Sequence, residues 1–102
     1  MKTKQTAKKP ESKIQAEILK YLKEKNIYAE KMIVGNRSGL PDIRCCVGGK
    51  FVAIEVKTGK NLPTPLQRKS IYDIEKSGGY AIVAYSLTEV INFINSIKGG
   101  VK

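Results

Sequence analysis

The first half of the chain contains a segment whose apolar residues repeat at the spacing of an α-helix. These residues are Ile14, Ile18, Tyr21 and Leu22. Because residues three or four positions apart share one face of a helix, the pattern predicts a helix from about Lys13 to Lys25. Ser12 and Gln15 have the spacing of a capping box, in which each side chain binds a free amide at the start of the helix.

The second half of the chain predicts two more helices. Thr64 suits the N-cap position, Pro65 the first helical position and Gln67 the third. This helix should end at Gly78, a residue that readily takes the left-handed conformation of helix ends. Ser86 is the predicted cap of the last helix. The apolar residues of that helix are Val90, Ile91, Phe93, Ile94 and Ile97.

Strands are predicted in the segments between these helices. The strand-like runs are Ile27 to Val34, Asp42 to Val47, Lys50 to Thr58 and Tyr80 to Tyr85. Only Gly48-Gly49 separates the second run from the third, which is a strong signal for a two-residue hairpin. The last run is continuously apolar, as is typical of a central strand buried on both faces. The element order α-β-β-β-α-β-α predicts an α/β protein with a mixed sheet, helices on both faces and a parallel last strand.

Composition narrows the chemistry that such a domain can perform. The 102 residues include 19 Lys and Arg, 9 Asp and Glu and no His, which gives a formal net charge of +10. Without His, the chain has no Ser-His-Asp triad, Cys-His pair, HExxH zinc helix or two-Cys-two-His finger. The charge favours a nucleic acid as partner, although a soluble surface with a basic tail is the alternative.

Length and charge distribution predict a single domain. We expect it to span residues 11–98, between a basic, disordered arm at 1–10 and a tail at 99–102. The longest apolar run is far shorter than the roughly 20 residues of a membrane helix. The chain lacks a signal-peptide pattern, and its adjacent Cys45 and Cys46 suit a reducing compartment. We therefore expect an intracellular, cytoplasmic protein with no membrane partner.

The hairpin register brings charged residues to one face of the sheet. A two-residue turn pairs Val47 with Lys50, and counting outward places Asp42 directly opposite Glu55. Alternation along the strand puts Lys57 on the same face. The opposite, apolar face carries Val52, Ile54 and Val56.

Two carboxylates held this close repel each other, and each raises the other's pKa unless a cation lies between them. A hard divalent ion such as Mg²⁺ or Mn²⁺ suits carboxylate oxygens and water. Lys57 could then position or deprotonate an attacking water, or stabilise negative charge on phosphorus. The alternative is an exposed cross-strand ladder of salt bridges among Asp42, Glu55 and Lys57.

The same residues form a motif. Pro41-Asp42, twelve intervening residues and Glu55-Val56-Lys57 read P-D-x12-E-x-K, which resembles the PD-(D/E)xK nuclease superfamily. The string Gly39 to Ile43, together with Gln67, is most similar to its virus-type replication-repair nuclease branch, the VRR-NUC domain. Archaeal Holliday junction resolvases have a similar pattern. The resemblance covers essentially the whole predicted domain and implies a restriction-endonuclease-like mixed sheet flanked by helices.

The resemblance implies a Mg²⁺-dependent endodeoxyribonuclease, with Mn²⁺ as a substitute, that hydrolyses phosphodiester bonds. Its implied metal ligands are Asp42, Glu55 and the backbone carbonyl of Val56, and Lys57 is the water-positioning group. The family also places a glutamate of the first helix near the metal. Glu17 matches because it borders the apolar face of that helix, although a solvated charge is its alternative role.

Gln67 and several cations complete the implied site. Gln67 matches an active-site glutamine of the family, although its place in a capping box with Thr64 is a competing local role. Arg37 and Ser38, in the Gly-rich loop before Asp42, could hold a phosphate. The other candidate DNA contacts, which could equally be solvated, are Lys60, Arg68 and Lys69.

Partners follow from the same resemblance. It implies branched DNA such as four-way junctions, a two-fold homodimer, and a viral or bacterial host cell as the setting. The alternatives are a nicking or restriction-type nuclease, a non-catalytic nucleic-acid-binding module with the same fold, and an interaction protein with a basic surface. The five tyrosines fall in predicted core elements and are interpreted as packing residues rather than as a base-stacking platform.

Overall fold

The computed structural model describes residues 9–32 and 39–99 of the chain. Its elements are α1 (Glu11–Glu24), β1 (Tyr28–Lys31), β2 (Ile43–Val47), β3 (Lys50–Val56), α2 (Pro65–Lys76), β4 (Tyr80–Ala84) and α3 (Leu87–Gly99). This is the predicted order, with β1 shorter than expected. Arg37, Ser38 and the first eight residues of the predicted arm lie outside the described residues.

The four strands form one mixed sheet in the order β1-β2-β3-β4. β1, β2 and β3 pair antiparallel, and β4 pairs with β3 in parallel, as predicted. The β2–β3 hairpin has the predicted register, with Val47 opposite Lys50. Gly48 and Gly49 make its turn at φ of 57° and 81°, a conformation that favours glycine.

Strand β4 lies at an edge of the sheet, so the prediction of a central strand at Tyr80 to Tyr85 was wrong. Helices α2 and α3 both contact β4, so its apolar side chains pack on helices although one strand neighbour is missing. Burial on both faces was also wrong, because Ala84 is the one buried residue of β4 and Tyr80 is exposed. A continuous apolar run indicates packing against neighbouring helices, and it does not report how many strands flank the strand.

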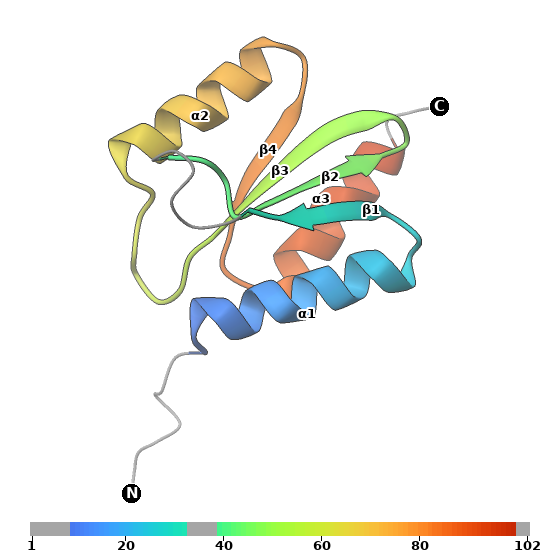
Figure 1. The fold of residues 1–102 in the computed structure, drawn as a ribbon, viewed down its shortest axis with the longest axis horizontal. Coiled ribbons are helices and arrows are strands. Elements are labelled where there is room, and N and C mark those ends of the chain that lie inside the picture. Colours follow the sequence, from blue (N-terminus) through green and yellow to red (C-terminus); the bar gives the residue numbers. More distant parts are fainter. Residues whose placement is uncertain (1–8, 33–38, 100–102) are drawn as a thin grey trace, which may run out of the picture.

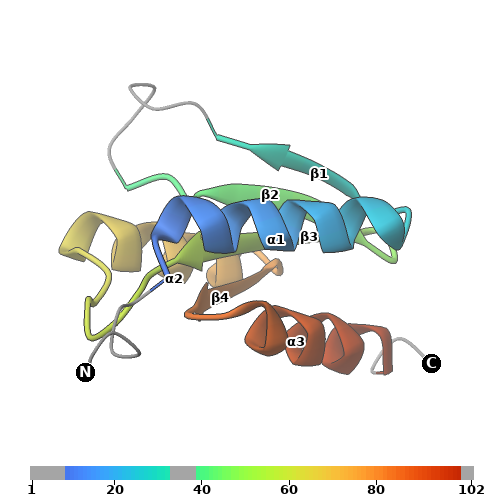
Figure 2. The ribbon, with the colours of Figure 1, turned by 90° about the horizontal axis from the view of Figure 1, so that it is seen from below.

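Helices cover the two faces of the sheet unequally. α1 and α3 pack on one face and contact each other, whereas α2 packs against β3 and β4 on the other face (Figures 1 and 2). No helix within residues 9–32 and 39–99 has the length and apolar character needed to cross a membrane.

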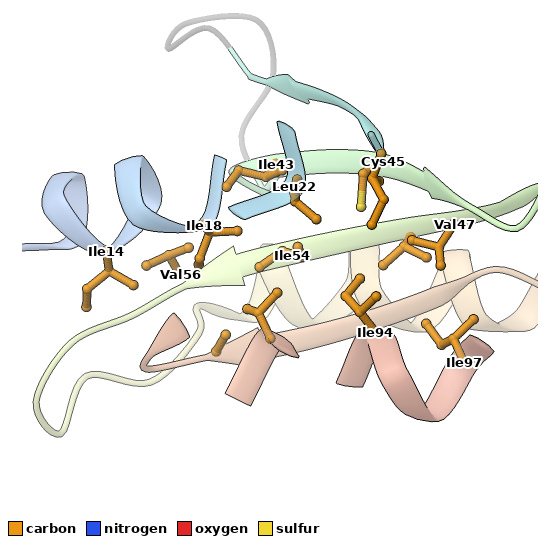
Figure 3. Close-up of a cluster of buried hydrophobic side chains, with 14 residues drawn as sticks. Ile14, Ile18, Leu22, Ile43, Cys45, Val47, Ile54, Val56, Ile94 and Ile97 are labelled. Carbon is orange, nitrogen blue, oxygen red and sulfur yellow. The ribbon is translucent and has the colours of Figure 1, made fainter. Parts of the chain in front are cut away.

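The core lies between α1, α3 and the sheet (Figure 3). Its fully buried side chains include Ile18, Leu22, Ile43, Val52, Ile54, Val56, Val90 and Ile94. Burying one such side chain stabilises the fold by roughly 1.5–3 kcal/mol. Cys45 also lies in this core, where burial raises the pKa of its thiol to about 11, while Cys46 on the other face is exposed. Neither cysteine is in a disulfide, as expected.

Helix α1 begins earlier than predicted, and the capping box at Ser12 was wrong. Pro10 is the N-cap, and its carbonyl accepts hydrogen bonds from the N–H groups of Lys13 and Ile14 at 3.1 and 3.2 Å. Because φ of Pro10 is held at −61°, the chain enters the helix directly after it and encloses Ser12 in the first turn. Lys9, placed in the predicted disordered arm, has an ordered carbonyl that accepts a hydrogen bond from Thr58 Oγ1 at 2.7 Å.

The interpretation of every tyrosine as a packing residue was also wrong. Tyr28 is 67% exposed and Tyr72 is 62% exposed. Tyr28, Cys46 and Phe51 form a cross-strand row on the face that carries α2, and all three are exposed. α2 packs mainly on β3 and β4, which leaves the side chains of Tyr28 and Cys46 toward the β1 edge of that face exposed.

Gly39 brings the segment before β2 against the start of α2. Its φ is 85°, and a Cβ atom at this position would lie 2.7 Å from the carbonyl oxygen of Leu66. Gly49 has a similar φ of 81°, but a Cβ atom there would meet nothing within 4 Å. The two glycines therefore share the conformational requirement, and only Gly39 also has the steric one.

We predict that Gly39→Ala destabilises the protein by more than Gly49→Ala. Both variants place a side chain at positive φ, which costs about 1 kcal/mol, and Gly39→Ala adds a clash with backbone that should bring the total to about 3 kcal/mol. Urea unfolding monitored by circular dichroism measures the difference. Equal midpoints for the two variants would show that the Gly39 contact can relax without loss.

Candidate active site

The β2–β3 hairpin brings the two predicted carboxylates to one end of the sheet. The last paired residues of the ladder are Ile43 and Ile54, so Asp42 and Glu55 come next in register. The backbone of Asp42 is fixed by a hydrogen bond, in which its carbonyl accepts the N–H of Met32 at 2.8 Å. Its carboxylate Oδ2 accepts the N–H of Val56 at 2.7 Å, which leaves the other oxygen available.

Glu55 is the buried member of the pair, with 3% of its surface exposed. Its Oε2 accepts a hydrogen bond from Gln67 Nε2 at 2.9 Å and lies 3.7 Å from the Lys57 ammonium. Its Oε1 is buried and has no hydrogen-bond partner within the part of the chain that the structure describes. A buried carboxylate oxygen without a partner is a costly arrangement, which a bound proton or cation would relieve.

The surroundings of Glu55 favour its protonated form. Burial, the largest cause, and the nearby charge of Asp42 together raise the pKa of Glu55 from its ordinary 4.5 to about 8. The Lys57 ammonium acts in the opposite direction but does not cancel these effects. Without a cation, the two carboxylates therefore share a site that favours one extra proton at neutral pH.

The donor set fits a hard divalent cation that keeps part of its water. In residues 9–32 and 39–99, no three Asp, Glu, Cys or His side chains gather as a metal-binding group. Two carboxylates are nevertheless the usual protein contribution to a Mg²⁺ site, which is completed by water and substrate phosphate. The unpartnered Oε1 of Glu55 is the atom that such an ion would satisfy.

Two glutamates of α1 differ in their relation to this pair. Glu17, the residue expected from the family pattern, forms an ion pair with Lys9 at 2.8 Å. Glu11, the first residue of α1, is near enough for its charge to raise the pKa of Glu55. Sequence reasoning missed Glu11, although its spacing of three and seven residues from Ile14 and Ile18 places it on the buried face of the helix.

Gln67 takes part in the predicted capping box and also contacts Glu55. Its Oε1 accepts the N–H of Thr64 at 2.8 Å in a complete capping box, while its Nε2 donates to Glu55. The two contacts do not compete, because opposite ends of one amide make them, a compatibility that sequence alone does not show.

The predicted DNA-contacting cations flank this end of α2. Arg68 donates to the carbonyl of Pro63 at 2.9 Å, and Lys69 forms an ion pair with Asp73 at 2.9 Å. Lys60 is exposed and forms no ion pair with a described residue. The structure thus places Lys60 in solvent and gives Arg68 and Lys69 partners within the protein.

Comparison with known proteins identifies solved structures that have a similar fold. No protein-family model and no curated protein matches the sequence. A solved structure described as a VRR_NUC domain protein aligns with a TM-score of 0.75 over 87% of this chain and 88% of its own, at 24% identity. A second, described as a VRR_NUC domain, aligns with a TM-score of 0.72 over 83% of this chain and 94% of its own, also at 24% identity.

A third similar structure is Hjc of Archaeoglobus fulgidus, described as a Holliday junction resolvase. It aligns with a TM-score of 0.58 over 74% of this chain and 67% of its own, at 23% identity. The chain therefore has the restriction-endonuclease-like fold that the sequence motif implied, and it shares this fold with VRR_NUC domains and an archaeal resolvase.

Proposed function

We propose that this protein is a metal-dependent endonuclease that hydrolyses phosphodiester bonds of DNA. The observation that carries the proposal is the unpartnered, buried Oε1 of Glu55 beside Asp42, with Lys57 on the same face. An exposed ladder of salt bridges does not account for an acid that is 97% buried, because exposed pairs remain hydrated. A DNA-binding module without catalysis gains nothing from acids that face phosphate.

Asp42, Glu55 and the backbone carbonyl of Val56 would hold Mg²⁺, and Mn²⁺ would substitute. When bound, the ion supplies positive charge that offsets the carboxylate repulsion and polarises the scissile phosphate and a water. Glu11 or Glu17 would add an acidic group from α1 to this site. We favour Glu11 because its charge contributes to the raised pKa of Glu55.

The residues of the chain have separate tasks in hydrolysis. The oxygen of a water would form a new bond to phosphorus while the bond from phosphorus to the leaving sugar oxygen breaks; the attacking water would release one proton to solvent, and the leaving oxygen would take one up from solvent. Lys57, with 12% of its side chain exposed, would orient this water and offset negative charge on the phosphate oxygens. Gln67 would hold Glu55, and Lys60 would contact a neighbouring phosphate.

Branched DNA is the proposed substrate, and a two-fold homodimer is the proposed active form of the protein. The net charge of +10 suits a polyanion, and the Hjc neighbour is described as a Holliday junction resolvase. One chain carries one site, whereas resolving a four-way junction needs two paired cuts. Two copies related by a two-fold axis would supply both sites.

We predict that Asp42→Asn and Glu55→Gln each abolish cleavage while DNA binding is retained or strengthened. Each change removes charge directed at the metal without removing a phosphate contact. Labelled four-way junction, flap, duplex and single-stranded DNA, incubated with Mg²⁺, Mn²⁺ or EDTA, provide the assay. Glu75→Gln, an exposed change on α2, is the matched control.

Cleavage within tenfold of wild type for both variants would rule out the metal site. Sedimentation at micromolar concentration and a supercoiled cruciform plasmid test the dimer separately. A monomer that yields only nicked circles would contradict the dimer and leave the nuclease intact.

We predict that stability of the metal-free protein falls as pH rises from about 5 to about 8. The folded pKa of Glu55, about 8, exceeds its ordinary 4.5, so the folded state binds more protons in this window and loses stability with pH. The slope should approach about 1.4 kcal/mol per pH unit from this group. Thermal unfolding of wild type and Glu55→Gln measures it, since the variant lacks the titrating group.

Mg²⁺ or Mn²⁺ should raise the melting temperature of wild type at pH 8 and should have little effect on Glu55→Gln. A metal effect of the same size in both proteins would mean that the ions bind elsewhere.

We predict that Glu11→Gln raises the Mg²⁺ concentration needed for cleavage, by about tenfold, and that Glu17→Gln does so less. The reason is that Glu11 acts on the pKa of Glu55, whereas Glu17 is paired with Lys9. Cleavage rates across a Mg²⁺ titration measure both variants. A larger rise in the Mg²⁺ requirement for Glu17→Gln than for Glu11→Gln would make Glu17 the acidic residue that the first helix contributes to the site.

A further inference from the structure

The start of α2 and the candidate active site share one side chain, Gln67. Its Oε1 accepts a hydrogen bond from the N–H of Thr64 at 2.8 Å, and its Nε2 donates to Glu55 Oε2 at 2.9 Å. An amide oxygen only accepts, and an amide nitrogen only donates. The N–H of Thr64 therefore determines which end of the amide faces Glu55.

Thr64 also holds the backbone of Gln67. Thr64 Oγ1 accepts the N–H of Gln67 at 3.1 Å, which completes the capping box. Pro65 follows in the first helical position and restricts the backbone between the two partners. Reversing the amide would point Oε1 at the Glu55 carboxylate and Nε2 at the N–H of Thr64, so both hydrogen bonds would be lost together.

The held amide controls how Glu55 presents its two oxygens. Gln67 Nε2 and the Lys57 ammonium both approach Oε2, at 2.9 and 3.7 Å. Oε1 is left without a partner among the described residues and is the oxygen available to a cation. Groups that fix a metal-binding carboxylate commonly set its affinity for the ion.

We propose that Thr64 is a positioning residue for the metal-binding carboxylate of Glu55 and acts through the amide of Gln67. This inference rests on the proposed function. Thr64 forms its hydrogen bonds with Gln67 and Arg68, and the bonds that begin α2 also orient the donor that holds Glu55. Loss of the cap should therefore affect the metal site in addition to the helix.

A second helix cap provides the matched control. Ser86 Oγ accepts the N–H of Glu89 at 3.3 Å at the start of α3, which packs with α1 on the other face of the sheet. Thr64→Ala and Ser86→Ala each remove one capping hydroxyl, so both should lower the melting temperature by a similar amount. Thr64→Ser keeps the hydroxyl and should behave as wild type.

The side-chain amide signals of Gln67 in ¹⁵N NMR report the positioning without any metal. Wild type, Ser86→Ala and Thr64→Ser should show two distinct amide protons that exchange slowly with water. Thr64→Ala should show faster exchange and a shift toward the values of a free amide. Unchanged Gln67 signals in Thr64→Ala would overturn the proposal.

Calorimetric titration of the DNA-free protein with Mn²⁺ measures the consequence for the site. Thr64→Ala should weaken Mn²⁺ binding about tenfold, while Ser86→Ala and Thr64→Ser should keep the wild-type affinity. Equal affinities in Thr64→Ala and Ser86→Ala would contradict the proposal. A wild-type protein that binds no Mn²⁺ would overturn the proposed function, and the NMR comparison would still decide whether Thr64 positions the amide.

Discussion

The register of the β2–β3 hairpin decides which side chains enter the core and which form the site. Side chains alternate along a strand, so a slip of one residue would turn Glu55 toward the core and Ile54 away from it. In the observed register, Ile54 and its apolar neighbours pack on α1 and α3, and the burial of these residues opposes any slip. The core thus holds Asp42 and Glu55 in place from the opposite face of the sheet.

This register also forces an unfavourable contact between like charges. Glu55 is buried beside Asp42, and burial together with the charge of Asp42 raises its pKa to about 8. The aliphatic core offsets such a destabilising pair because it lies on the other face, where the carboxylates do not interrupt its packing. The aliphatic core and the buried carboxylate pair therefore occupy different faces of one sheet, and the repulsion within the pair does not weaken the core directly.

Although the predicted capping box at Ser12 was wrong because α1 begins after Pro10, local rules were sufficient for several interactions between residues close in sequence. The turn at Gly48-Gly49, its register and the capping box of Thr64 and Gln67 are of this kind. They were insufficient where distant segments meet. The contact between Gln67 and Glu55, and the exposure of Tyr28, depend on where α2 lies on the sheet, which no short pattern encodes.

The position of the first helix relative to the site shows the same limit. Thr58, just after β3, donates to the carbonyl of Lys9, and this bond fastens the start of α1 beside the loop that follows Lys57. Glu11 is two residues from that bond, whereas Glu17 is six residues farther along α1, or about 9 Å at the helical rise. Periodicity alone placed Glu17 at the border of the apolar face. The Thr58–Lys9 hydrogen bond, which joins segments far apart in sequence, fixes the start of α1, where the charge of Glu11 contributes to the raised pKa of Glu55, and the role of Glu17 stays a prediction.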